Sequence, residues 1–156
     1  YGVPQNRERV FIIGIRDDAD NTFRFPKTQH LTKKLKDVLE NNINDKYFLS
    51  ETNNKRVNQN YNKHKYTIEK GDFMDSYNQT IHKYVSPTIT TRVSASACNH
   101  IFEEKKIRRL TPRECFRLMD FPEDFKWSVS DTQAYKQAGN SIVVNVLAEI
   151  INKLNL

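Results

Sequence analysis

Two arginines near the start of the sequence have the type and spacing to bind an anionic or polar ligand. Arg7 and Arg9 stand at alternate positions just ahead of the apolar run VFIIGI at residues 10–15. Guanidinium groups are planar, permanently charged donors that suit phosphate and the polar edges of bases. If the extended segment reaches back to both residues, their side chains point to the same side. A surface ion pair with Glu8 is the alternative interpretation.

A second candidate site lies in the middle of the chain, where Thr88, Thr90 and Arg92 alternate. On a strand they would share one face. Short hydroxyl groups beside an arginine can read base edges or hold phosphates. Threonines are also common on any β-strand, so the pattern alone does not decide between the two.

A third candidate site precedes the last apolar stripe of the chain. Asn140 or Ser141 is predicted to cap a helix that starts next to Gly139 and carries its apolar residues between positions 143 and 154. The free N–H groups behind such a cap favour an anionic ligand group. An amphipathic helix with an ordinary cap accounts for the same residues.

Charge and composition narrow the class of protein. Residues 46–109 hold 12 basic and 6 acidic side chains, and the rest of the chain is balanced, so the net charge of +6 comes from the middle. A solvated surface and a nucleic-acid-binding module both explain that excess. No apolar run is long enough to cross a bilayer, and we expect a cytoplasmic protein. Cys98 and Cys115 lack metal-ligand spacing, which predicts reduced thiols and no metal site.

The elements that must position these residues are predicted as follows. Residues 10–15 form a buried strand, a helix capped by Thr32 follows, and residues 41–65 lack regular structure. Residues 84–102 form a strand, a loop and a second strand. The stretch RRLTPRECFRLMDFPEDFKW at residues 108–127 contains a short helix, in which Thr111 and Glu114 make a capping box and Asp120 marks the end.

Three stretches together resemble the DNA (cytosine-5)-methyltransferases. Residues 1–16, with Gln5, Arg7 and Arg9, are similar to the eighth conserved block of that family. Residues 108–127 are similar to the ninth block, and QAYKQAGNSIVV at residues 133–144 to the tenth. The basic middle occupies the position of the variable target-recognition domain.

The resemblance implies roles for the candidate residues. Arg9 would lie beside a cytosine flipped into the catalytic pocket, and Arg7 would help to hold the nucleotide. Asn140 and Ser141 would line the S-adenosylmethionine site. The dipeptide at residues 88–89 resembles one that recurs in the recognition domain, and its neighbours usually contact the target bases, which in this chain suggests residues 88, 90 and 92.

The same resemblance implies what is missing. The family's Gly-rich cofactor loop, its Pro-Cys nucleophile and its catalytic glutamate have no counterpart, and neither Cys98 nor Cys115 follows a proline. Without the thiolate that attacks carbon 6 the methyl acceptor cannot be activated. We therefore expect the chain to be inactive alone, to need the N-terminal catalytic half as partner, and to self-associate when isolated.

These expectations define an α/β fold: the C-terminal piece of a Rossmann-like methyltransferase domain, with a strand at the start and a helix at the end, framing a small mixed α+β target-recognition domain. Residues 1–18 and 129–156 belong to the catalytic domain, 19–107 to the recognition domain and 108–128 to a brace. The expected function is that of a fragment or subunit that recognises double-stranded DNA and completes the S-adenosylmethionine pocket. The alternative is a non-catalytic DNA-binding or regulatory remnant.

Overall fold

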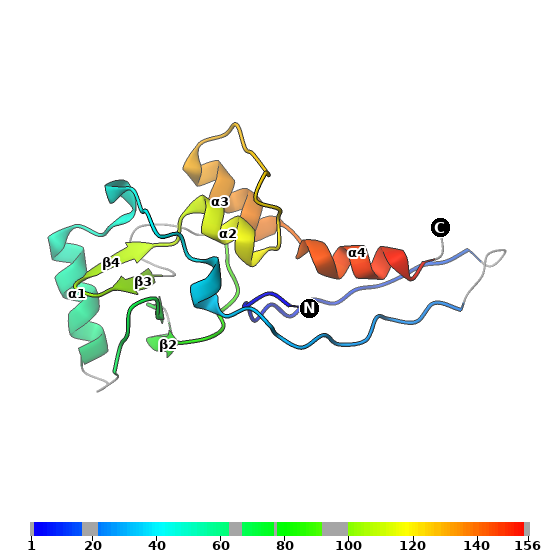
Figure 1. Cartoon of the computed structure of the whole chain (residues 1–156), viewed down its shortest axis with the longest axis horizontal. Coiled ribbons are helices and arrows are strands. Elements are labelled where there is room, and N and C mark those ends of the chain that lie inside the picture. The colour runs from blue at the N-terminus through cyan, green and yellow to red at the C-terminus, as the bar shows by residue number, and fades with distance from the viewer. Residues whose placement is uncertain (1, 17–21, 63–66, 77, 92–99, 155–156) are drawn as a thin grey trace.

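The chain folds into a body and an arm (Figure 1). The computed structural model describes residues 2–16, 22–62, 67–76, 78–91 and 100–154. The body contains an antiparallel sheet with helices on both faces. The arm contains the last helix, α4 (Val144–Asn152), and the extended residues 2–16 and 22–33, of which the first few lie against the body. A hollow lined by residues 22 and 24–29 together with Glu149 of α4 and the adjacent Lys153 shows that α4 lies beside the second extended segment.

The sheet has four short antiparallel strands in the order β2-β1-β3-β4. They are β1 (Phe73–Asp75), β2 (Thr80–His82), β3 (His100–Glu103) and β4 (Lys106–Arg109). Because side chains alternate along a strand, each face receives its own apolar set. Met74 and Ile107 pack on Val57 and Tyr61 of α1 (Glu51–Asn62), which covers one face.

The opposite face of the sheet packs on a second core. Phe73 and Ile101 contribute to it, with residues from the short 3₁₀ helices η1 (Leu35–Val38) and η2 (Asp45–Tyr47) and from helices α2 (Pro112–Leu118) and α3 (Asp131–Asn140). Phe116 of α2 is buried there. The rings of Phe121, Phe125 and Trp127 surround it, with centroids 4.9–5.1 Å away.

Helix α2 begins and ends as predicted. The Thr111 hydroxyl accepts a hydrogen bond from the Glu114 N–H at 3.1 Å, and the Glu114 carboxylate accepts one from the Thr111 N–H at 2.8 Å. Asp120 follows the helix with a φ of 59°, a left-handed conformation that Asp tolerates better than most residues. The capping box and the stop signal are both confirmed.

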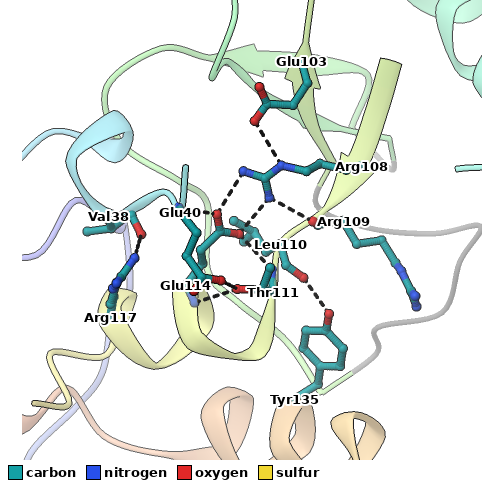
Figure 2. Close-up of polar contacts among 10 residues, drawn as sticks. All are labelled: Val38, Glu40, Glu103, Arg108, Arg109, Leu110, Thr111, Glu114, Arg117 and Tyr135. Carbon is teal, nitrogen blue, oxygen red and sulfur yellow. Dashed lines mark hydrogen bonds and ion pairs between the residues drawn. The ribbon is translucent and has the colours of Figure 1, made fainter. Parts of the chain in front are cut away.

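A buried ion pair joins α2 to the sheet (Figure 2). The Arg108 guanidinium donates to both carboxylate oxygens of Glu114, at 2.8 and 2.9 Å, and neither side chain is exposed. Arg108 also donates to Glu103 at 3.0 Å, and the backbone N–H of Glu40 donates to Glu114 at 2.9 Å. Nearby, the Tyr135 hydroxyl of α3 donates to the Leu110 carbonyl at 2.6 Å. Strand β4, α2, α3 and the segment after η1 are thus fixed to one another.

The prediction of a buried strand at residues 10–15 is wrong for this chain. The segment is extended but pairs with no strand of the described structure, and Val10 and Ile12 are 89% and 91% exposed. A β-strand needs a neighbour to satisfy its N–H and C=O groups. The apolar run therefore has strand-forming residues without a sheet to join.

Three other element predictions need correction. The Asn-rich residues 41–65 contain η2 and α1, because Val57 and Tyr61 gain burial against the sheet that helix propensity alone does not provide. The helix expected after Thr32 is only the single turn η1, which begins after Lys34. Of the two strands expected in residues 84–102, the second coincides with β3, whereas the first forms only an isolated bridge at Ser86.

The predicted cap of the last helix is also wrong. Asn140 is the final residue of α3 and Ser141 follows as its C-cap, while α4 starts after Val143 with no side-chain cap bond. Within the described residues, none of the helices is long and apolar enough to cross a membrane.

Candidate functional site

The N-terminal segment lies against the middle of the chain through a short parallel bridge. The backbone of Ser86 accepts from the Asn6 N–H and donates to the Pro4 carbonyl, both at 2.8 Å. This bridge brings residues 4–9 beside residues 86–90. Two of the three candidate sites, far apart in sequence, therefore meet.

The buried side chain of Gln5 stabilises this contact. Its carbonyl oxygen accepts from the Ile89 N–H at 3.2 Å, and its amide donates to the Leu118 carbonyl of α2 at 3.0 Å. One amide group thus joins the N-terminal segment, the middle segment and α2.

Arg7 extends the contact to the third candidate site. Its guanidinium donates to three backbone carbonyls: to Ile89 at 3.0 Å through Nη1, and to Gly139 and Ser141 at 2.9 Å each through Nη2. Burial, and then the charge of Arg9, lower the pKa of Arg7. An arginine nevertheless stays protonated in proteins, so it acts here as a permanent cation among carbonyl dipoles.

Gly139 completes the meeting of the three segments. A Cβ added there would come within 2.7 Å of the Thr90 carbonyl carbon and 2.8 Å of both the Thr90 oxygen and the Thr91 nitrogen. Real Cβ atoms do not approach backbone so closely, so only glycine allows α3 to touch this part of the chain. We call the contacts of Gln5, Arg7 and Gly139 with residues 89–91 and 141 the seam.

The other predicted site residues lie around the seam. Arg9 is exposed, and its guanidinium donates to the carbonyl of the neighbouring Glu8. Thr88 is half-buried, with its hydroxyl donating to the Asn6 carbonyl at 2.7 Å, while Thr90 is exposed. Ile89 between them is buried, so the backbone alternates as the sequence predicts. Arg92 lies outside the described residues.

Asn140 and Ser141 lie where α3 ends. The Asn140 side chain is exposed, so its amide can donate to and accept from a ligand. The Ser141 hydroxyl donates to the Ala138 carbonyl at 2.8 Å, which leaves the hydroxyl oxygen as an acceptor. This pair has the donor and acceptor groups that a polar cofactor needs.

The two roles that sequence reasoning missed are those of Gln5 and Gly139. In the sequence, Gln5 stands out only as part of a motif, and Gly139 only as the residue before a predicted helix. The sequence contains no signal for either contact, because both partners are far away along the chain. Gln5 binds Ile89, more than 80 positions later, and Gly139 packs on Thr90, about 50 positions earlier. Of the two cysteines, Cys98 lies outside the described residues and Cys115 is buried, which raises the pKa of its thiol.

Comparison with known proteins gives one consistent family. The family model of the C-5 cytosine-specific DNA methylases matches residues 1–155. The chain is 35% identical over 158 residues to the type II methyltransferase M.DsaV of Dactylococcopsis salina, covering 99% of this chain and 44% of that protein. It is 36% identical over 164 residues to M.HhaI of Haemophilus parahaemolyticus, covering 96% and 48%. The chain thus spans less than half the length of these relatives.

Solved structures share the fold. A DNMT2 mutant of Spodoptera frugiperda aligns with a TM-score of 0.59 at 18% identity, covering 99% of this chain and 54% of that one. The Dnmt2 methyltransferase of S. pombe aligns with a TM-score of 0.55 at 22% identity, covering 82% and 43%. The chain therefore shares its fold with about half of each of these larger chains.

Proposed function

Because the chain belongs to the C-5 cytosine-specific DNA methylase family, we propose that it is the C-terminal part of a DNA (cytosine-5)-methyltransferase. In this proposal it binds and recognises double-stranded DNA and completes the S-adenosylmethionine pocket. The seam is the observation that carries it. Arg7 donates hydrogen bonds both to Ile89 of the proposed recognition segment and to Ser141 of the proposed cofactor site. The recognition segment and the cofactor site are therefore held next to each other.

The arm supports an N-terminal catalytic half as the partner. Its exposed apolar side chains include Val10, Ile12, Phe25, Leu147 and Ile151. An extended apolar segment without a sheet suits addition to the edge of a sheet, where each backbone group gains a partner. That half either precedes the chain in one polypeptide or is a separate subunit.

The chemistry also favours such a half. Cys98 does not follow a proline, as the nucleophile of the family does, and burial raises the pKa of the Cys115 thiol and keeps it protonated. S-adenosylmethionine supplies the methyl group when bound, and Asn140 and Ser141 would hold it through their amide and hydroxyl groups. Arg9, exposed beside the seam, would orient the extruded cytosine. Extruding the base is required because its ring atoms cannot be reached inside a duplex.

In this proposal the chain divides as its sequence suggests. Residues 1–18 and 129–156 complete the catalytic domain, residues 19–107 form the recognition domain and residues 108–128 brace the two. Residues 88, 90 and 92 carry sequence discrimination, because hydrogen bonds to base edges distinguish one base pair from another and contacts to phosphate do not.

The test is reconstitution. The chain is mixed with its own N-terminal half, and transfer of labelled methyl from S-adenosylmethionine to unmethylated genomic DNA is measured, with bisulfite sequencing to locate carbon-5 methylation. We expect transfer only when both parts are present. Methyl transfer by the chain alone would contradict the proposal. DNA binding by the complex without transfer would favour a non-catalytic DNA-binding remnant.

Substitutions in that complex test the assigned roles. Arg9→Ala should lower kcat about 100-fold, the usual cost of losing one group that stabilises the transition state, with little change in DNA affinity. Asn140→Ala should instead raise the KM for S-adenosylmethionine about 10-fold, the loss of roughly one hydrogen bond. Arg24→Ala is the matched control, because Arg24 is also exposed on the arm and also donates to the preceding carbonyl. Arg24→Ala should keep wild-type kinetics, and wild-type kinetics in both Arg9→Ala and Asn140→Ala would contradict the assignments.

A further inference from the structure

We propose that Arg7 is a positioning residue that couples DNA recognition to cofactor binding, through its simultaneous bonds to the Ile89, Gly139 and Ser141 carbonyls. The inference rests on the proposed function, because it takes residues 88–90 as facing DNA and residues 140–141 as facing the cofactor. It adds that the two sites are not independent.

The geometry of the guanidinium makes the coupling rigid. Its nitrogens lie in one plane at fixed positions, so Nη1 and Nη2 cannot move separately. Nη1 holds Ile89, and Nη2 holds both Gly139 and Ser141. A displacement of the recognition segment therefore either breaks the bond to Ile89 or moves the end of α3 with it.

Direct packing of the backbone prevents the recognition segment from moving away from the Arg7 guanidinium and breaking the bond to Ile89. Gly139 lies against the Thr90 carbonyl with no room for a methyl group, so the recognition segment cannot slide toward α3. Gln5 opposes movement in the other direction, because its side chain binds the Ile89 N–H and the Leu118 carbonyl together. The Ile89–Thr90 backbone is thus held on three sides, and the end of α3 moves when it moves.

Such a link predicts a measurable thermodynamic coupling. When DNA fixes residues 88–90, Ser141 is fixed too, and the cofactor binds to a site that is already ordered. By reciprocity the cofactor must strengthen DNA binding by the same factor. Typical coupling between two protein sites changes affinity about 5- to 150-fold, and we expect a value in this range.

The test measures the affinity of the reconstituted complex for S-adenosylhomocysteine, by calorimetry, with and without unmethylated genomic DNA fragments. Arg7→Lys keeps the charge but replaces the planar fork with one ammonium, which cannot hold three carbonyls in fixed positions. The ratio of the two affinities should fall below about 3-fold, which is under the usual range for coupled sites. Gly139→Ala, whose Cβ would push the recognition segment away, should lower the ratio in the same way.

Arg117→Ala is the control variant. Arg117 also donates to a backbone carbonyl, that of Val38 at 3.1 Å, and it also makes an ion pair, but it lies outside the seam. It should lower stability while keeping the wild-type ratio. A wild-type ratio in both Arg7→Lys and Gly139→Ala overturns the inference, and so does loss of the ratio in Arg117→Ala.

Hydrogen exchange on the isolated chain separates this inference from the proposed function. The Ile89 N–H, which binds Gln5, should exchange at least 10-fold faster in Arg7→Lys if the seam holds the backbone in place, since the loss of one such hydrogen bond is worth about a factor of ten. Unchanged exchange overturns the inference whatever the enzyme does. A wild-type complex that methylates DNA without any coupling overturns it alone, whereas a complex that neither binds nor methylates DNA overturns the proposed function.

Discussion

Arg7 and Arg9 stand two positions apart and have opposite environments. Arg7 is held by three carbonyls, while Arg9 is exposed and contacts only its neighbour's carbonyl among the hydrogen bonds of the described residues. The shared residue type predicts a shared function, but the different hydrogen-bond partners give the two side chains different roles. One side chain fixes protein segments, and the other is available to a ligand.

His100 shows how a single side chain can set the response of the fold to acid. It is buried in β3, where Nδ1 lies 2.8 Å from the Ser76 hydroxyl. Burial, with the nearby charges of Arg109 and Arg56, lowers the pKa of His100 to about 4 from an ordinary 6.5. The native state thus holds a neutral imidazole that the unfolded chain protonates more readily.

This difference predicts loss of stability in acid. Between pH 6.5 and about pH 4, His100 is protonated in the unfolded chain but neutral in the folded chain. Its contribution to the free energy of unfolding is therefore complete above pH 6.5 and is lost as the pH falls toward 4. The expected loss is about 3 kcal/mol across that window. Urea unfolding of wild type and His100→Gln between pH 4 and 7 measures it.

The His100→Gln variant should be less stable at neutral pH and lose less stability on acidification. His30→Gln, which changes an exposed histidine, should follow the wild-type pH profile. Parallel profiles for wild type and His100→Gln would show that the buried imidazole does not control the acid response.

At the scale of elements, the Arg108–Glu114 pair is the buried ionic link between α2 and the sheet, beside the apolar core that both share. Removing one partner leaves the other charge buried without compensation, which typically costs about 3–5 kcal/mol. Glu114→Ala should therefore lower the free energy of unfolding by about that amount, as measured by denaturant titration. The variant also loses the capping bond to Thr111, which adds to the effect.

A more exposed ion pair, between Arg117 of the same helix and Glu123 beyond its end, gives the comparison. Arg117 donates to Glu123 at 2.7 and 2.9 Å, but the Glu123 side chain is 66% exposed. Glu123→Ala should cost less than about 1 kcal/mol, since water replaces the lost partner. Equal losses for Glu114→Ala and Glu123→Ala would mean that burial of the first pair has no energetic consequence.

The elements also differ in how far the sequence could predict them. Helix α2 was predictable, because Thr111, Glu114 and Asp120 act within a few residues of one another. Helix α1 was not, because its Asn-rich sequence favours turns and only the burial of Val57 and Tyr61 stabilises it. The candidate sites were located by residue type, but their meeting at the seam depends on long-range contacts that spacing does not encode.

At the scale of the whole molecule, the arm predicts self-association of the isolated chain. Val10 and Ile12 are nearly fully exposed, and further apolar side chains of α4 are partly exposed. Apolar surface of this kind drives association. Sedimentation velocity over a range of concentrations should show oligomers for the wild type and mostly monomer for the double variant Val10→Asp, Ile12→Asp.

Val129→Asp is the matched control, because Val129 is an exposed valine of the body. It should associate like the wild type. A concentration-independent monomer in the wild type would argue that the arm covers its own apolar surface in solution.

The separation of body and arm has a consequence for the order of events during synthesis. Both apolar cores and the buried ion pair lie within the body, so the body can reach its folded state at a rate independent of concentration. If the proposed catalytic half is a separate chain, docking of the arm on it would be a later, bimolecular step. Before such docking the chain would consist of a folded body with an exposed arm, and we expect proteases to cut its extended segments first.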